Sequence, residues 1–175
     1  MGIIQKADPV KLIAGFIFKQ ETLYLRARQQ LVRRFGEIDY ESAILPFTLT
    51  HYYEKEFGAA LQRAFVSFKK LIPSQKLSEI KIITNRIESS FCEGRNRTVN
   101  IDPGYVDLAK LVLASTKDYV HRIHLNKGIF AEITLHYQDK SFHPWTWTYP
   151  DYQTQEYIRI FNRIRELYAL QIKQK

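Results

Sequence analysis

The sequence contains only one cysteine, Cys92, so it can form neither an internal disulfide nor a zinc site built from several thiolates. It also lacks any stretch that approaches the roughly 20 apolar residues of a membrane-spanning helix. The apolar run KLIAGFIF is short, and Lys11 and Lys19 bracket it, which is not the pattern of a signal peptide. We therefore expect a soluble, cytoplasmic protein with no membrane partner.

The chain is instead rich in positive charge and in aromatic rings. It carries 26 Lys and Arg residues against 18 Asp and Glu residues, which gives a net charge of +8. Such an excess favours anionic partners such as a nucleotide, RNA or a phosphorylated metabolite. Aromatic residues make up 14% of the chain, so rings contribute heavily to the core or to a binding surface. The length of 175 residues predicts one domain, residues 1–175.

The first hundred residues alternate between strand-like and helix-like patterns. Short apolar runs rich in β-forming residues predict strands, and apolar residues three or four apart predict helices. The segment THYYEKEFGAA is expected to form a loop or a short helical turn. The other expected elements are a strand at 11–18, a helix at 21–36, a strand at 38–47 that ends near Pro46, a strand at 61–72, a helix at 74–91 and a strand at 97–101. This β-α-β-β-α-β order is typical of the split βαβ arrangement of ferredoxin-like domains.

The remaining residues extend this unit. The pattern predicts a short, mostly buried helix over residues 106–115, a β-hairpin over 119–137 and a C-terminal helix over 154–175. In the last helix Tyr157, Phe161, Ile164 and Tyr168 form an apolar stripe. The predicted fold class is α+β: a mixed, mostly antiparallel sheet with a ferredoxin-like N-terminal part, extended by a helix, a hairpin and a C-terminal helix.

The hairpin has a register that its own sequence can define. A three-residue loop at 126–128, with Gly128 in the left-handed conformation, places the apolar side chains of both strands on one face. On the other face Arg122 lies opposite Glu132, either as a simple ion pair or as an anion-binding arginine held by its carboxylate. The predicted cross-strand pairs are Leu125–Ile129, Ile123–Ala131, His121–Ile133, Arg122–Glu132 and His124–Phe130.

The segment VNIDPGY, residues 99–105, follows a strand pattern with polar and turn-forming residues. Asp102, Pro103 and Gly104 suit a type II turn, and Asp102 could alternatively cap the following helix. Either role explains these residues without chemistry. If Asp102 is functional, we expect its partners to be Asn100, Tyr105 and the turn at 126–128. If a helix at 106–115 returns antiparallel to the strands, it carries Lys117 and Asp118 to the other end of the sheet, whereas a non-crossover connection would bring them close to Asp102.

Motifs of known nucleotide-binding and hydrolytic sites are absent from the sequence. There is no GxxxxGK[ST] phosphate loop, no GxGxxG, no HExxH, no CxxC and no GxSxG. The tetrapeptide STKD at 115–118 lacks the spacer residue of the guanine-binding [NT]KxD motif. Two of the hairpin histidines, His121 and His124, point to opposite faces of a strand, and His136 lies far along the ladder. We therefore predict no metal site and no cofactor.

Several segments together resemble one bacterial family. They are HYYEKEFG, FVSFKKLI, VNIDPGY, KLVLASTKDYVHRI, KGIFAEITL and WTYPDY, and the opening ADPVKLIAGFIF also fits. The chain is similar to this family of uncharacterised proteins, which is a domain of unknown function with some members automatically labelled as GTP-binding. The resemblance implies no catalytic residues, and the absence of a phosphate loop argues against the GTP label.

Three functions fit these features. The first hypothesis is a cytoplasmic protein that binds an anionic ligand: a nucleotide, RNA or a phosphorylated metabolite. The second is an enzyme, a hydrolase or transferase, with Asp102 or Asp118 as acid or base and Lys117 or Arg122 stabilising negative charge. The third is an interaction module with the loop PWTWTYPDY as an aromatic anchor. The alternative for that loop is that Trp145, Trp147 and Tyr149 point inward and cover the core.

The candidate ligand-binding residues are polar side chains near the ends of the predicted strands, while the catalytic residues, if any, cannot be named. An alternative interpretation of His121 is a hydrogen-bonded histidine of the core with no role in a site. The candidates are Asn100, Asp102, Tyr105, Lys117, Asp118, His121, Arg122 and Glu132.

Overall fold

The computed structural model describes residues 2–50, 54–94 and 96–173. Its strands are β1 (Lys11–Phe18), β2 (Ile38–Glu41), β3 (Leu45–Pro46), β4 (Gln62–Phe68), β5 (Cys92–Glu93), β6 (Asn96–Arg97), β7 (Val99–Val106), β8 (Lys110–Ser115), β9 (Ile123–Asn126), β10 (Ile129–Gln138) and β11 (Ser141–Pro144). Its helices are α1 (Glu21–Phe35), α2 (Glu54–Phe57), α3 (Leu77–Ser89) and α4 (Gln155–Lys173), with short 3-10 turns at Ser74–Lys76 and Pro150–Gln153. Within the loop expected after Thr50, residues 51–53 lie outside the described residues.

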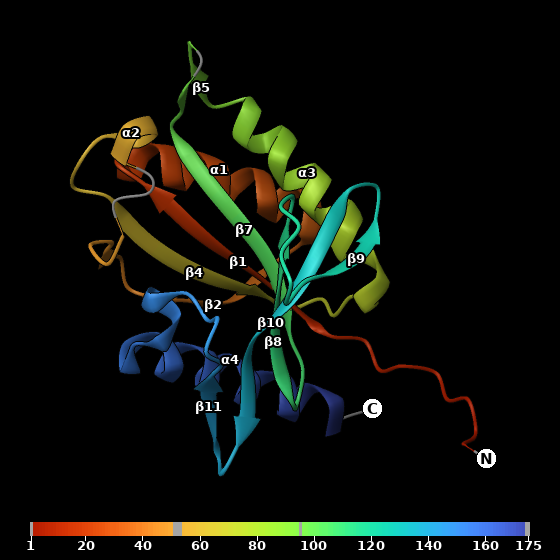
Figure 1. The fold of residues 1–175 in the computed structure, drawn as a ribbon. Helices are drawn as coiled ribbons and strands as arrows, with labels where there is room; N and C mark the ends of the chain where they lie inside the picture. Colours follow the sequence, from red (N-terminus) through yellow and green to blue (C-terminus); the bar gives the residue numbers. More distant parts are fainter. Residues whose placement is uncertain (1, 51–53, 95, 174–175) are drawn as a thin grey trace.

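One large sheet organises these elements (Figure 1). Its strands follow the order β11-β10-β8-β7-β1-β4-β2, and β1 pairs antiparallel with both β4 and β7. The α+β class with a mostly antiparallel sheet and a C-terminal helix is therefore confirmed. Within this sheet the strands β1, β2, β4 and β7 are neighbours in the order β7-β1-β4-β2. The ferredoxin-like assignment itself stays a prediction.

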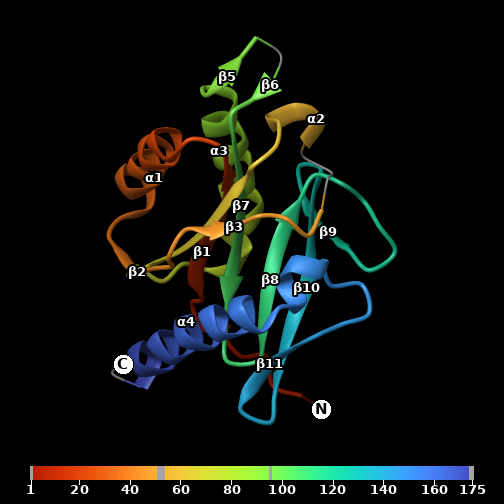
Figure 2. The same ribbon diagram turned by 90° about the vertical axis from the view of Figure 1, so that its left-hand side faces the viewer.

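The two faces of the sheet carry different helices. Alternate residues of β1 point to opposite faces, so Leu12 and Phe16 pack with α1 and α3, whereas Ile13 packs with α4. Figure 2 shows α1 and α3 covering the upper part of the sheet and α4 crossing its lower part. The apolar stripe of α4 is buried as predicted, with Phe161 and Ile164 fully covered. On the side of the sheet that α4 covers, the upper part is not covered by this helix, and a cavity lies there.

Residues 110–115 form strand β8, and the helix predicted at 106–115 is wrong. Leu111 and Leu113 pack on the α4 side of the sheet, while Val112 and Ala114 pack on the other side with Leu77 of α3. A strand buried on both faces has a continuous apolar run, which periodicity alone cannot distinguish from a buried helix. Because β8 runs antiparallel to β7, its C-terminal end returns to Asp102.

The turn or helix cap predicted for DPGY is also wrong, because these residues lie inside β7. Asp102 pairs with Gly15 of β1 and Gly104 pairs with Ile13. A Cβ atom on Gly104 would lie 2.3 Å from the carbonyl oxygen of Val112, so glycine permits a close approach of β8. Pairing with β8 covers only residues 104–106, since the proline at 103 has no N–H to continue the ladder.

The hairpin is present with a shorter turn than predicted. Lys127 and Gly128 both have positive φ, at 54° and 72°, and form a two-residue turn that places Asn126 opposite Ile129. The register shifts after Ile129, and the predicted pairs His124–Phe130 and Ile123–Ala131 are therefore present. The predicted pair Leu125–Ile129 is wrong, because Ile129 pairs with Asn126, and the predicted pair His121–Ile133 is wrong, because β9 begins only at Ile123. No helix in the described part of the chain is long and apolar enough to cross a membrane.

Candidate functional site

The sheet opens between β7 and β8 beyond Pro103, and α3 side chains fill the gap. The N–H of Ile101 donates to Oε1 of Glu88 at 2.6 Å, and the carbonyl of Ile101 accepts from Nζ of Lys81 at 3.1 Å. A carboxylate and an ammonium thus replace the backbone groups that β8 would offer at this level. Both side chains are buried, so α3 brings a positive and a negative charge to the floor of the opening.

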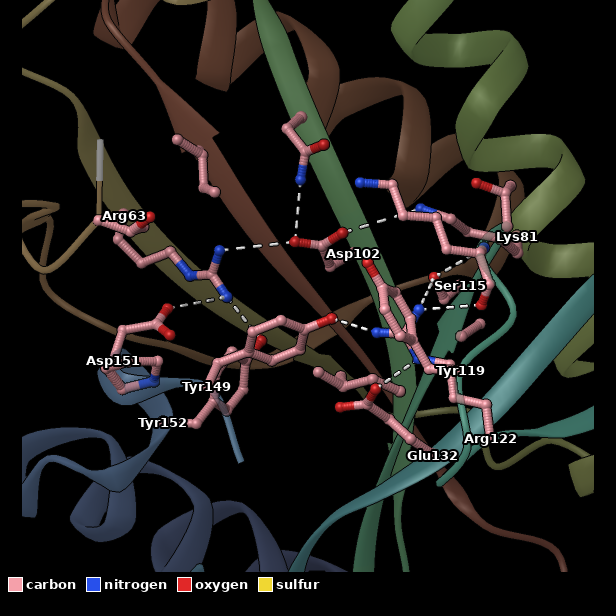
Figure 3. Close-up of a pocket in the computed structure, with 18 of the residues that line it drawn as sticks. Arg63, Lys81, Asp102, Ser115, Tyr119, Arg122, Glu132, Tyr149, Asp151 and Tyr152 are labelled. Atoms are coloured by element: carbon pink, nitrogen blue, oxygen red, sulfur yellow. Dashed lines mark hydrogen bonds and ion pairs between the residues drawn. The ribbon is translucent and has the colours of Figure 1, made fainter. Parts of the chain in front are cut away.

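Asp102 lies beside this gap and faces two cations (Figure 3). Its Oδ2 is 3.5 Å from an Arg63 nitrogen and its Oδ1 is 3.8 Å from Nζ of Lys81. Asn100, two residues earlier on the same face of β7, donates to Oδ2 at 2.8 Å. The DPGY segment therefore directs one carboxylate between cations that come from β4 and α3.

Arg63 reaches Asp102 by crossing β1. It extends from β4 over Gly15, where a Cβ atom would lie 3.2 Å from the Arg63 terminal nitrogen and 3.0 Å from the Phe65 ring. Its guanidinium lies 4.7 Å from the centre of the Phe65 ring and 5.2 Å from that of Tyr152. Glycine at position 15 is thus the residue that leaves space for a fully buried arginine.

The polar partners of Arg63 are few for a buried guanidinium. It donates one hydrogen bond, to the Tyr152 hydroxyl at 2.5 Å, and its Nε has no partner among the described residues. The carboxylates of Asp102 and Asp151 are 3.5 and 3.9 Å away, which is an ion-pair rather than a hydrogen-bond distance. Burial disfavours the charged form of Arg63, but the oxygen groups of Tyr152, Asp151 and Asp102 keep its pKa raised. The guanidinium therefore stays charged.

Arg122 is the opposite case, because its donors are well occupied. It donates to Glu132 at 2.7 Å, to the Ser115 hydroxyl and the Lys117 carbonyl at 2.9 Å, and to the Tyr149 hydroxyl at 2.5 Å. The predicted Arg122–Glu132 pair is therefore present, and both side chains are nearly completely buried. This arginine joins the loop after β8 to β10 and to the aromatic loop.

A cavity of about 600 Å³ lies above these groups on the upper part of the α4 face. Its floor comes from β4, β7, β8, β10 and the α3 side chains that fill the gap, and its walls come from the loop after β8 and the segment that leads into α4. The charged residues that line it are Arg63, Lys81, Arg97, Lys117, Arg122, Glu88, Asp102, Glu132 and Asp151. The volume lies within the range of ordinary small-molecule sites.

Stacked rings form one wall of the mouth. His121 lies between Tyr119 and Trp147, with ring centres 6.0 and 5.7 Å away, and Trp147 stacks on Trp145 at 5.2 Å. The indole N–H of Trp147 donates to the Ile133 carbonyl, which holds the stack against β10. Trp147 and Tyr149 line the cavity, and Trp145 stacks on Trp147 outside the lining. Each of the three is 37–42% exposed, so none is buried in the core.

Burial determines the ionisation of several lining groups. It raises the pKa of Glu88 above its ordinary value, against the opposing effect of Lys81. It also raises the pKa of Asp151, against the effect of Arg63. Burial and the Glu132 carboxylate raise the pKa of Tyr149 to about 12, so its phenol is neutral at neutral pH.

The structure brings six of the eight candidate residues to the cavity: Asn100, Asp102, Lys117, His121, Arg122 and Glu132. Of the partners expected for Asp102, Asn100 is in contact with it. Tyr105 lies on the opposite face of β7, packed against Val112 and Ala114, and the turn at 126–128 does not line the cavity. Asp118 does not line it either, whereas Lys117 does. The antiparallel β7–β8 pair explains why Lys117 and Asp102 share one cavity.

Sequence reasoning missed Arg63, Lys81, Asp151 and Tyr152 as site residues. Arg63 directly precedes the apolar run AFV in QRAFVSF, and Lys81 stands among three isoleucines in LSEIKII. A charged residue at a position predicted to be buried is the available signal, because such a residue needs a partner or a function. Among the described residues, no group of three or more His, Cys, Asp or Glu is placed to hold a metal ion.

Fold and cavity together define an α+β protein with a charged cavity on one face of an antiparallel sheet. Residues 8–168 match the family model described as "Domain of unknown function (DUF4416)". The chain belongs to this family, which confirms the resemblance seen in the sequence. No curated protein and no solved structure matches the chain.

Proposed function

We propose that this protein binds a small anionic molecule in the cavity, with Arg63 and Lys81 as the cations that hold it. The observation that carries the proposal is the bonding of Arg63. Its guanidinium is fully buried, donates one hydrogen bond and has an Nε without a partner among the described residues. A buried donor without a partner costs free energy, and an anion in the cavity would supply the missing acceptors.

Lys81 supports the same assignment from the other side of Asp102. It donates one hydrogen bond, to the Ile101 carbonyl, although an ammonium group has three donors. The other two arginines that line the cavity differ in this respect: Arg122 uses four of its five donors, and Arg97 is held by Glu56 and Glu88. Arg63 and Lys81 are therefore the pair with donor capacity to spare at the cavity floor.

The size of the cavity favours a small ligand over a nucleic acid. A site of about 600 Å³ suits a phosphorylated or carboxylated metabolite, or a nucleotide. The proposal includes a cytoplasmic location, in keeping with a chain that has one cysteine. RNA binding and turnover of the ligand stay predictions.

Thermal shift at low salt tests the proposal, with inorganic phosphate, citrate, AMP and a short RNA oligomer as probes. A ligand at about 100 times its Kd stabilises the native state by about 2.7 kcal/mol, a clear rise in Tm. We expect Arg63→Lys and Lys81→Gln to reduce the rise for the small anions. Lys76→Gln, which removes an exposed charge near the start of α3, is the matched control.

Unchanged shifts in both Arg63→Lys and Lys81→Gln would disprove the assignment of these cations. A shift with RNA alone would favour the nucleic-acid hypothesis. Because Arg63 is buried, circular dichroism of each variant first establishes that it is folded.

A further inference from the structure

We infer that the ligand carries a hydrogen-bond donor, a hydroxyl or an ammonium group, next to its anionic group, and that Asp102 accepts the hydrogen bond. The inference rests on the proposed function and narrows it to one class of anion. Hydroxy acids, amino acids and phosphate esters with a neighbouring hydroxyl belong to this class, whereas simple carboxylates and alkyl phosphates do not.

The first step is the unused bonding capacity of Asp102. A carboxylate offers about four acceptor positions. Asp102 uses one of them, for the Asn100 amide at 2.8 Å. Oδ1 has no hydrogen bond within the described part of the chain, since Lys81 is 3.8 Å away. The side chain is 25% exposed and lines the cavity, so these acceptor positions are open to a ligand.

The second step is the position of Asp102 between the two proposed cations. Arg63 and Lys81 approach the same carboxylate, at 3.5 and 3.8 Å, from β4 and from α3. An anionic group that contacts either cation therefore comes close to Asp102. Two negative groups a few ångström apart repel each other, most strongly where water is scarce.

The third step is how a ligand avoids this repulsion. A hydroxyl or ammonium group beside the anion donates to Asp102, and the anion then accepts from Arg63 or Lys81. The floor thus places the acceptor Asp102 between the donors Arg63 and Lys81. A ligand that fits it carries a donor group for Asp102 next to an anionic group for one of the cations. A site built in this way rejects an analogue that lacks the donor, because the carboxylate would then be left against the bare anion.

Matched compounds separate this inference from the proposed function. Glycerol 3-phosphate and propyl phosphate share the phosphate ester and differ in the hydroxyls. Malate, aspartate and succinate share two carboxylates and carry a hydroxyl, an ammonium or a hydrogen at the same carbon. Calorimetric titration of the whole chain with each compound measures the preference in the phosphate and carboxylate arms.

We expect the donor-bearing member of a pair to bind about 10- to 100-fold more tightly, the range of one hydrogen bond to a charged group. In Asp102→Asn, which keeps the shape and removes the charge, the preference should fall to within about threefold. Asp118→Asn removes a neighbouring carboxylate that does not line the cavity and should leave the preference unchanged.

Each outcome bears on one of the two statements. Equal binding of both members of every pair by the wild type overturns the inference and leaves anion binding in place. A preference that persists in Asp102→Asn overturns the role of Asp102. Absence of binding by all five compounds contradicts the proposed function and the inference together.

Discussion

The guanidinium of Arg63 and the carboxylate of Asp102 lie 3.5 Å apart although their strands, β4 and β7, are separated by β1. The long arginine side chain can reach over the intervening strand only where that strand carries no side chain on the shared face. Gly15 is that position, because it pairs with Asp102 on one side and with Phe65 on the other. One glycine therefore links a buried cation to the cavity.

Gly15→Ala should displace Arg63 and weaken anion binding. The added Cβ would lie 3.0 Å from the Phe65 ring and 3.2 Å from the Arg63 nitrogen, so one of them has to move. Overpacking of this kind costs about 1–3 kcal/mol, measurable by urea unfolding. Binding of inorganic phosphate, followed by calorimetry, should weaken as well. Gly2→Ala, where a Cβ meets nothing within 4 Å, is the control, and wild-type binding by Gly15→Ala would refute the steric argument.

Removal of Arg122 should destabilise the protein strongly. Glu132, nearly completely buried, would lose its closest cation, and an uncompensated buried charge costs about 3–5 kcal/mol. We expect Arg122→Met and Glu132→Gln each to lower the free energy of unfolding. The double variant should lose less than the sum, because neither charge is then left alone. Additive losses in a urea-unfolding cycle would mean that the pair is not coupled.

Much of the fold could be predicted because local patterns and tertiary packing agree there. The strand at 11–18, the helix that ends before Gly36 and the stripe of α4 follow from periodicity and residue type. The helix predicted over residues 106–115 was wrong because local pattern and tertiary packing do not agree in segment 110–115. It is buried on both faces, so its sequence carries no polar positions to reveal a period of two.

The turn or helix cap predicted for DPGY was wrong because a Pro-Gly pair can have more than one structural role. Locally the pair favours a turn, and this preference was the only one visible in the sequence. In the structure the proline ends the ladder toward β8 and the glycine admits the Val112 carbonyl. Both uses depend on a neighbouring strand. The ion pairs of Asp102 with Arg63 and Lys81 also could not be predicted, because these residues are distant in sequence and only the tertiary structure brings them together.

The buried carboxylate of Glu88 should make stability depend on pH. Burial raises its pKa in the native state above the ordinary value of 4.5, so the folded protein holds this proton more tightly than the unfolded chain. The contribution of Glu88 therefore favours the folded state below that value and is lost as the pH rises through the raised pKa.

Urea unfolding between pH 4 and pH 7 checks this expectation, because that range includes the ordinary pKa of 4.5 and the region above it. The free energy of unfolding of the wild type should fall with rising pH relative to Glu88→Gln. Glu79→Gln removes an exposed charge from the same helix and controls for the loss of one negative charge. If the free energy of unfolding depends on pH in the same way in the wild type and in Glu88→Gln, burial does not raise the pKa of Glu88.

Both tryptophans of the chain stand at the mouth of the cavity, so their fluorescence should report binding. Trp147 lines the cavity, whereas Trp145 does not line it and stacks on Trp147 at 5.2 Å. Titration of Trp145→Phe with glycerol 3-phosphate should change the emission of the remaining Trp147. The same titration of Trp147→Phe should give a smaller change, because Trp145 is one ring further from the ligand. An equal response from the two variants would mean that the ligand does not reach this wall or that it binds elsewhere.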